Sequence, residues 1–137
     1  MFKIIQKSCL ALALMFGVGA NADVTVGKLK DGIRHVNAAQ AGQVVQQYPD
    51  VVVLDIRTPK EFNDAHIAGA LNIDYYASDY KQNLAKLDKD TTYLLHCRSG
   101  VRSGRSLKLF RELGFKNVIH LDGGIKAWRS GGLPLNE

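Results

Sequence analysis

The sequence predicts a single α/β domain built around a mostly parallel β-sheet. Three short apolar runs, at residues 51–54, 92–95 and 118–121, have the unbroken hydrophobic character of strands that are buried on both faces. Stretches with helical spacing of apolar residues lie between them, and this alternation of strands and helices is typical of a parallel sheet. The chain contains no internal repeat and no low-complexity segment that would indicate another architecture.

The first expected helix lies before the first of these strands. It covers residues 38–47, and Asn37 in front of it is a residue type that caps helix N-termini. Residues 23–32 carry no such pattern and are expected to form a flexible lead-in. After the first strand, the irregular stretch at 74–90 is expected to cross over the sheet as a loop with a short helix near residues 84–87.

Two more helices are expected in the second half of the chain. The longer one follows the strand at 92–95, because four apolar residues recur there at helical spacing before Gly114 ends the helix. These four residues are Leu107, Leu109, Phe110 and Leu113. The last helix covers 124–130 and ends at two glycines. Together, the expected strands and helices place the folded domain at residues 33–137.

Residues 1–22 have the features of a cleaved secretory signal. Two lysines give a positive start, residues 9–20 are nearly all apolar, and Ala20-Asn21-Ala22 is the small-residue pattern at which signal peptidase cuts. The apolar run is shorter than the ~20 residues that a membrane span needs, which favours cleavage over an uncleaved anchor. We therefore expect an exported protein, located in a bacterial periplasm, with no membrane association after cleavage.

The mature chain would start at Asp23 and contain 115 residues (137 less 22), which is enough for one hydrophobic core. Removal of the two lysines of the signal lowers the formal net charge from +5 to +3. A charge this small and scattered favours small anions or acidic partners and does not indicate nucleic acid binding. A monomer is the expected state for a domain of this size.

The cysteine content gives the first indication of function. Cys9 lies in the signal, so the mature chain keeps Cys97 as its single cysteine and has no internal disulfide. In an exported protein such a thiol is free and reactive, paired with another chain, or buried and inert. The residues that follow Cys97 favour the reactive thiol.

Cys97 begins a loop with the features of an anion-binding site, placed between a buried strand and the long helix. The ligand-binding crevice of an α/β sheet lies at the carboxyl ends of its strands, and successive loop N–H groups can surround an anion there. We expect Cys97 to be the nucleophile, the loop amides to form a cradle, and two arginines to stabilise the thiolate. The segment reads Cys97-Arg98-Ser99-Gly100-Val101-Arg102-Ser103.

Three residues of the loop have further expected roles. Gly100 suits a tight turn that needs positive φ. Ser99 and Ser103 can donate hydrogen bonds or cap the helix.

Residues 97–102 match the six-residue active loop of the rhodanese family of sulfurtransferases, and two further segments resemble the same family. The upstream segment contains Leu54-Asp55-Ile56-Arg57, Glu61-Phe62, His66-Ile67, Gly69-Ala70 and Asn72-Ile73. The downstream segment contains Gly123-Gly124-Ile125 and Trp128. Three motifs in the family's order make the resemblance specific, and it extends from about residue 33 to 135.

The resemblance implies a rhodanese-like domain, which is doubly wound around a central five-stranded, mostly parallel sheet with helices on both faces. It also implies a ping-pong reaction: a donor such as thiosulfate gives its outer sulfur to Cys97, and a thiol or cyanide removes it from the persulfide. No metal or organic cofactor is implied. The implied partners are a small anionic sulfur donor and a thiol acceptor, with a protein sulfur acceptor as a further possibility.

The upstream residues are expected to support the site rather than to react. Asp55 stands at a strand end, where it can accept hydrogen bonds from loop amides or pair with Arg57. Glu61 and His66 are expected to hold a short helix and the turn that follows it. His96 should point to the opposite side of its strand from the loop, so it is not expected to act as a base.

Two rival functions differ from a small-molecule sulfurtransferase in features that can be tested. Cysteine phosphatases and arsenate reductases place five residues between cysteine and arginine, whereas four separate Cys97 from Arg102, and a shorter cradle suits one sulfur atom better than a phosphate. A carrier that takes sulfur from a protein donor is the second rival. Tyr75, Tyr76 and Tyr80 could shape its docking surface, although packing of the crossover segment is the better explanation of these tyrosines. Thiosulfate alone would not load the cysteine of such a carrier.

Overall fold

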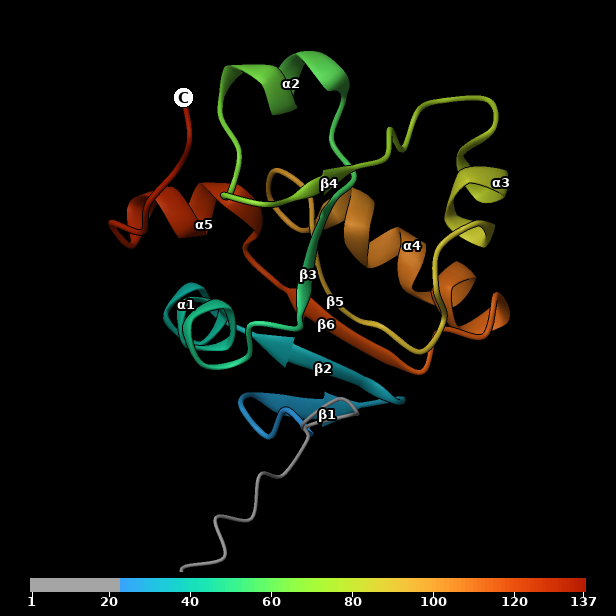
Figure 1. Ribbon diagram of the computed structural model, residues 1–137, viewed down its shortest axis with the longest axis horizontal. Coiled ribbons are helices and arrows are strands. Elements are labelled where there is room, and N and C mark those ends of the chain that lie inside the picture. Colours follow the sequence, from blue (N-terminus) through green and yellow to red (C-terminus); the bar gives the residue numbers. More distant parts are fainter. Residues whose placement is uncertain (1–22) are drawn as a thin grey trace, which may run out of the picture.

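The computed structural model describes residues 23–137, and the predicted signal at 1–22 lies outside them. Its centre is a six-stranded sheet with the strand order β1-β2-β6-β5-β3-β4 (Figure 1). The strands are β1 (Lys28–Lys30), β2 (Ile33–Val36), β3 (Val52–Asp55), β4 (Leu71–Asn72), β5 (Thr92–His96) and β6 (Asn117–Leu121). The helices are α1 (Ala38–Gln47), α2 (Pro59–Asp64), α3 (Tyr80–Ala85), α4 (Val101–Glu112) and α5 (Gly124–Ser130). None of these helices is long and apolar enough to cross a membrane.

The sheet is parallel except at one edge. Strands β2, β6, β5, β3 and β4 all run in the same direction, which matches the five-stranded parallel sheet that the resemblance implies. Strand β1 is a sixth strand that pairs antiparallel with β2. Asp31 and Gly32 join the two with φ values of 50° and 77°, as a two-residue hairpin requires. Residues 23–32, expected to form a flexible lead-in, therefore contain an edge strand, and Val24 among them is buried.

Helices cover both faces of the sheet, with α1 and α5 on one face and α3 and α4 on the other (Figure 1). Successive residues of β5 point to opposite faces, as in any strand. Leu94 packs in the cluster that contains Val44 of α1 and Trp128 of α5. Leu95 packs in the other cluster, with Phe110 of α4. The doubly wound architecture is therefore confirmed.

Local sequence explains where the helices begin. The Asn37 side chain accepts a hydrogen bond from the Gln40 N–H, and the Gln40 side chain accepts one from the Asn37 N–H, so a capping box starts α1. Helix α2 starts in the same way with Thr58 and Glu61, and Pro59 occupies its first position. Helices α1 and α5 have the predicted bounds, and the crossover helix lies at 80–85 instead of 84–87.

The carboxyl ends of the parallel strands meet at one edge of the sheet. In the register of the sheet, Asp55 at the end of β3 lies beside His96 of β5 and Asn72 of β4. On the other side of β5, Leu95 lies beside His120 of β6. Because Cys97 directly follows His96, the sheet places its sulfur at this edge, where ligands bind in open α/β sheets.

Candidate active site

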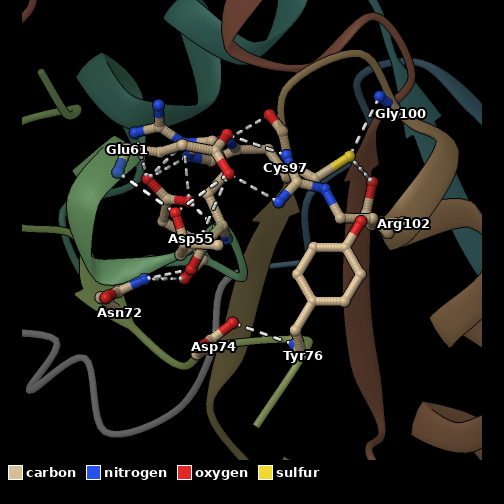
Figure 2. Close-up of polar contacts among 12 residues, drawn as sticks. Asp55, Glu61, Asn72, Asp74, Tyr76, Cys97, Gly100 and Arg102 are labelled. Atoms are coloured by element: carbon tan, nitrogen blue, oxygen red, sulfur yellow. Dashed lines mark hydrogen bonds and ion pairs between the residues drawn. The ribbon is translucent and has the colours of Figure 1, made fainter. Parts of the chain in front are cut away.

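The loop between β5 and α4 folds so that its polar groups point at the sulfur of Cys97. The Sγ atom accepts hydrogen bonds from the Gly100 N–H at 3.1 Å and from the Ser103 hydroxyl at 3.2 Å (Figure 2). Gly100 has the predicted positive φ, 95°, and caps the N-terminus of α4. A side chain at this position would also meet the backbone oxygen of Asp122, which lies 1.9 Å from an ideal Cβ. Only glycine therefore fits at the turn.

The cradle stabilises the thiolate although Cys97 is only 1% exposed. Burial raises the pKa of the Cys97 thiol, but hydrogen bonds from the Ser103 hydroxyl and from loop N–H groups outweigh this effect and leave the pKa below its usual value. The contributing N–H groups belong to Ser99, Gly100 and Ser103. The geometry thus provides the amide cradle expected from the sequence, around a sulfur that is enclosed by the protein.

Helix α5 supports the loop from behind. The Ile125 N–H donates to the Cys97 carbonyl at 2.9 Å, and the Lys126 N–H donates to the Arg98 carbonyl at 3.0 Å. Gly124, with φ of 63°, allows this approach, because a Cβ there would lie 2.3 Å from the Arg98 carbonyl oxygen. Gly124 is therefore the local feature that lets the loop rest on the helix N-terminus.

The two loop arginines occupy different environments. Arg102 forms a bidentate ion pair with Glu61, with N–O distances of 2.8 and 2.9 Å, and its guanidinium lies over the ring of Tyr76 (Figure 2). This pairing lowers the pKa of Glu61 to about 2, although partial burial acts in the opposite direction. Arg102 interacts electrostatically with Cys97, but much of its charge is balanced by Glu61. This partner was not predicted.

Arg98 is exposed and faces a pocket beside the loop. The pocket is bordered by side chains of both charges and a few apolar groups: Arg57, Glu61, Asp64, Ala65, Arg98, Ile125, Lys126 and Arg129. Four of these eight residues are basic, which suits an anion. Ser99 and Val101 complete the loop, and both are exposed at its outer side.

Residues of the upstream segment that resembles the rhodanese family form a buried polar network. Both carboxylate oxygens of Asp55 accept hydrogen bonds from the Arg57 side chain, at distances from 2.7 to 3.1 Å. Arg57 also donates to the Ala65 carbonyl, and the Asn72 side chain donates to the carbonyls of Asp55 and Arg57 (Figure 2). The expected Asp55–Arg57 pair is present. Its role is to hold β3, β4 and the α2 turn together rather than to touch the sulfur.

Two histidines behave as the sequence indicated. His66 makes a hydrogen bond with the Phe62 carbonyl and stacks on the Phe62 ring, so it holds the turn after α2. His96 is fully buried on the Asp55 side, with Nδ1 at 2.9 Å from the Cys97 carbonyl and Nε2 at 3.6 Å from Asp55. Loss of hydration lowers the pKa of His96, while Asp55 opposes this shift.

A third histidine, His120, was missed. Its Nε2 atom lies 2.8 Å from the Ser103 hydroxyl, which in turn contacts Cys97. Its Nδ1 atom lies 2.8 Å from Asp122, and the same carboxylate oxygen lies 2.6 Å from Nδ1 of His35. His120 and Asp122 stand two residues apart at the end of the last apolar run, a spacing that places both on one side of a strand. The contact with Ser103 depends on how α4 packs on β6.

Comparisons with known proteins agree with this arrangement. A sulfurtransferase from Allochromatium vinosum is 30% identical over 103 residues, which are 75% of this chain and 94% of that protein. A crystal structure of a rhodanese-related protein from Thermoplasma volcanium superposes with a TM-score of 0.66 and 30% identity, covering 75% of this chain and 97% of that one. A Rhodopseudomonas palustris structure described as a possible tyrosine phosphatase has a TM-score of 0.62 and 27% identity, covering 86% of this chain and all of that one.

Other curated relatives are longer than the region of similarity. The chain spans 20% of one of the first relatives that it matches and 50% of another. A family model described as "Rhodanese-like domain" matches residues 37–131, which include the strand, loop and helix that form the cradle. The chain therefore belongs to the rhodanese-like domain family.

Proposed function

We propose that the protein is a sulfurtransferase that carries a sulfur atom as a persulfide on Cys97. The observation that supports this most strongly is the convergence of N–H and hydroxyl donors on Sγ, which favours a thiolate and would also hold an added sulfur anion. The family's sulfurtransferases support the same reaction class. In the pocket beside Arg98, four basic residues outnumber two acidic ones, which supports an anionic donor, and thiosulfate is the simplest one.

The proposed reaction has two steps, each of which is a displacement at sulfur. In the first, the Cys97 thiolate attacks the outer sulfur of thiosulfate; the bond to the sulfonate sulfur breaks, and sulfite leaves with its electron pair. In the second, an acceptor thiolate or cyanide attacks the outer sulfur of the persulfide, and the Cys97 thiolate leaves. The N–H and hydroxyl donors of the loop can stabilise the anion in both steps, because the negative charge stays on a sulfur atom inside the cradle throughout.

A turnover assay tests the proposal. Thiosulfate and cyanide are supplied to mature protein, and sulfite and thiocyanate are measured beside the matched variant Cys97→Ser. We expect stoichiometric formation of both products with the wild type and none with the variant. Sulfite release at an equal rate from both proteins would refute the role of Cys97.

Phosphatase activity is the alternative that one structural neighbour's description raises. Two features disfavour it. Four residues, not five, separate Cys97 from Arg102. Both terminal nitrogens of Arg102 are engaged by Glu61, which leaves the guanidinium poorly placed to bind a phosphate in the loop. Hydrolysis of p-nitrophenyl phosphate that depends on Cys97, in a protein that does not release sulfite, would favour the phosphatase.

Export to the periplasm is also part of the proposal, and it rests on the pattern of residues 1–22. We expect protein isolated from its native compartment to begin at Asp23. Membrane-free protein that still begins at Met1 would contradict this.

A carrier that needs a protein donor would be indicated if Cys97 accepts sulfur from a persulfidated protein but not from thiosulfate.

A further inference from the structure

The Cys97 thiol has one polar neighbour that can take its proton. The polar groups around its sulfur within the described chain are the N–H groups of Ser99, Gly100 and Ser103, which only donate, and the Ser103 hydroxyl, which can both donate and accept. Bulk water has little access, because Cys97 is 1% exposed. His96, the neighbouring residue, makes its hydrogen bond with the Cys97 carbonyl and lies on the Asp55 side. Any proton that leaves the sulfur along these contacts must pass to Ser103.

Ser103 lies between two groups that compete for its single proton. Its oxygen is 3.2 Å from Cys97 Sγ and 2.8 Å from Nε2 of His120, and both Ser103 and His120 are buried. The carboxylate of Asp122 accepts from Nδ1 of His120, so a neutral His120 carries its proton on Nδ1 and presents a lone pair on Nε2. In that state the Ser103 proton points to His120, and the Ser103 oxygen is free to accept the proton of the Cys97 thiol.

We propose that His120 is the base that deprotonates Cys97, with Ser103 as the relay and Asp122 as the group that orients the imidazole. The S–H bond breaks and its proton goes to the Ser103 oxygen, while the original Ser103 proton goes to Nε2 of His120. A thiolate and an imidazolium result, and the total number of protons is unchanged. Ser103 then donates to the thiolate, and Asp122 faces the new positive charge. These proton transfers need no movement of heavy atoms.

The series of hydrogen bonds from Cys97 through Ser103 and His120 to Asp122 reaches solvent at its outer end. His35 of β2 shares the Asp122 oxygen, and the side chains of His35 and Asp122 are 24% and 55% exposed. The imidazolium proton of His120 can therefore be returned to water through this rim after each reaction. Asp122 also keeps the imidazole from rotating, because its oxygen binds Nδ1 while Ser103 binds Nε2.

The surroundings of His120 favour a neutral resting imidazole. The titratable groups that face it are Asp122 after β6, His35 on β2, His96 on β5 and, through Ser103 on α4, Cys97. Burial lowers the pKa of His120, and His35 acts in the same direction, while Asp122 acts against both. A base of low pKa is already deprotonated at neutral pH, so it is ready to accept the thiol proton.

The test measures the rate at which iodoacetamide alkylates Cys97 as a function of pH, because this neutral reagent needs no sulfur donor. In the wild type, we expect the rate to rise as His120 loses its proton, at a pH below the ordinary histidine pKa. In His120→Gln, which keeps a hydrogen-bonding group near Nε2, that inflection should disappear. Only direct ionisation of the thiol then remains, and the rate at pH 7 should fall about tenfold, the equivalent of one pKa unit.

Two further variants separate the relay from a structural effect. Ser103→Ala should reduce the rate to a similar extent, and the double variant should be no slower than either single one, because both changes interrupt one path. His66→Gln is the matched control: this histidine holds the turn after α2, outside the relay, and the variant should keep the wild-type pH profile. An unchanged profile in His120→Gln, or losses that multiply in the double variant, would overturn the relay.

A measurement on the wild type keeps the test decisive if a variant does not fold. NMR titration of the wild-type imidazoles gives the pH at which His120 loses its proton, and the relay predicts that the alkylation rate of Cys97 rises at that same pH. A rate that rises at a different pH would refute the relay. The inference rests on the proposed function only in taking Cys97 as the nucleophile. If the alkylation results hold and thiosulfate fails to load Cys97, the relay stands and the proposed sulfur donor is wrong.

Discussion

Replacing Glu61 by glutamine tests the tie between helix α2 and the active loop. The Glu61 carboxylate caps α2 by accepting from Thr58, and it also binds Arg102, which is 41 residues away on α4. Glutamine keeps the size of the side chain but removes its charge. The variant therefore leaves Arg102 without its counter-charge beside Tyr76, and we expect the folded state to lose stability.

The size of the loss follows from the ionisation of Glu61. Its pKa falls from 4.5 to about 2 on folding, chiefly through the hydrogen bonds from Arg102. A shift of this size corresponds to about 3 kcal/mol if taken in full. The Glu61 side chain is 31% exposed, so solvent screening reduces the value, and we expect a loss of about 1–2 kcal/mol at pH 7.

The pH dependence has a definite sign. Because the pKa of Glu61 is lower in the folded protein than in the unfolded one, its contribution is complete above about pH 5 and is lost as the pH falls towards 2. The difference between wild type and Glu61→Gln should therefore shrink to roughly half or less at pH 3.

Urea denaturation at pH 7, 5 and 3 measures this difference. Glu112→Gln serves as the matched control, because Glu112 forms an exposed pair with Lys108 at 3.8 Å, and such pairs contribute at most about 0.5 kcal/mol. A difference between wild type and Glu61→Gln that stays constant from pH 7 to 3, or a loss no larger than that of the control, would refute the reasoning.

Three other substitutions have expected outcomes. Gly100→Ala should lower stability by at least about 1 kcal/mol and slow the alkylation of the active cysteine, since φ is 95° and the new Cβ would meet the Asp122 carbonyl; wild-type reactivity would contradict this. Arg57→Met should cost about 3–5 kcal/mol in urea denaturation, because it removes the guanidinium that balances the charge of the buried Asp55; a loss below 1 kcal/mol would not fit. Gly32→Val should destabilise the β1 hairpin, where φ is 77°, by about 1–2 kcal/mol and leave thiol reactivity unchanged, as alkylation would show.

Much of the fold could be predicted because its signals are local. Helix α1 has its capping box at Asn37, and the buried strand β5 reads as an apolar run, so both appear in the sequence close to their true bounds. Strand β1 was missed because it is short, exposed and polar, with the pattern Lys-Leu-Lys. The only local sign of it was the Asp31-Gly32 pair, a typical two-residue hairpin turn.

The geometry around Cys97 was predicted where one segment carries it, and missed where distant segments meet. Cys97 and Gly100 lie in one loop, so their relation follows from the order of the residues. His120 reaches Ser103 only because β6 lies beside β5 in the sheet, and His35 reaches Asp122 across 87 positions. Such contacts depend on the order of the strands, which no local pattern contains.

The persulfide on Cys97 is the central claim, and intact mass spectrometry tests it most directly. Mature protein is measured before and after incubation with thiosulfate, beside Cys97→Ser. We predict a gain of the mass of one sulfur atom in the wild type, which cyanide removes and which the variant does not show. An unchanged mass on reduced protein whose Cys97 still reacts with iodoacetamide would contradict sulfur transfer from thiosulfate.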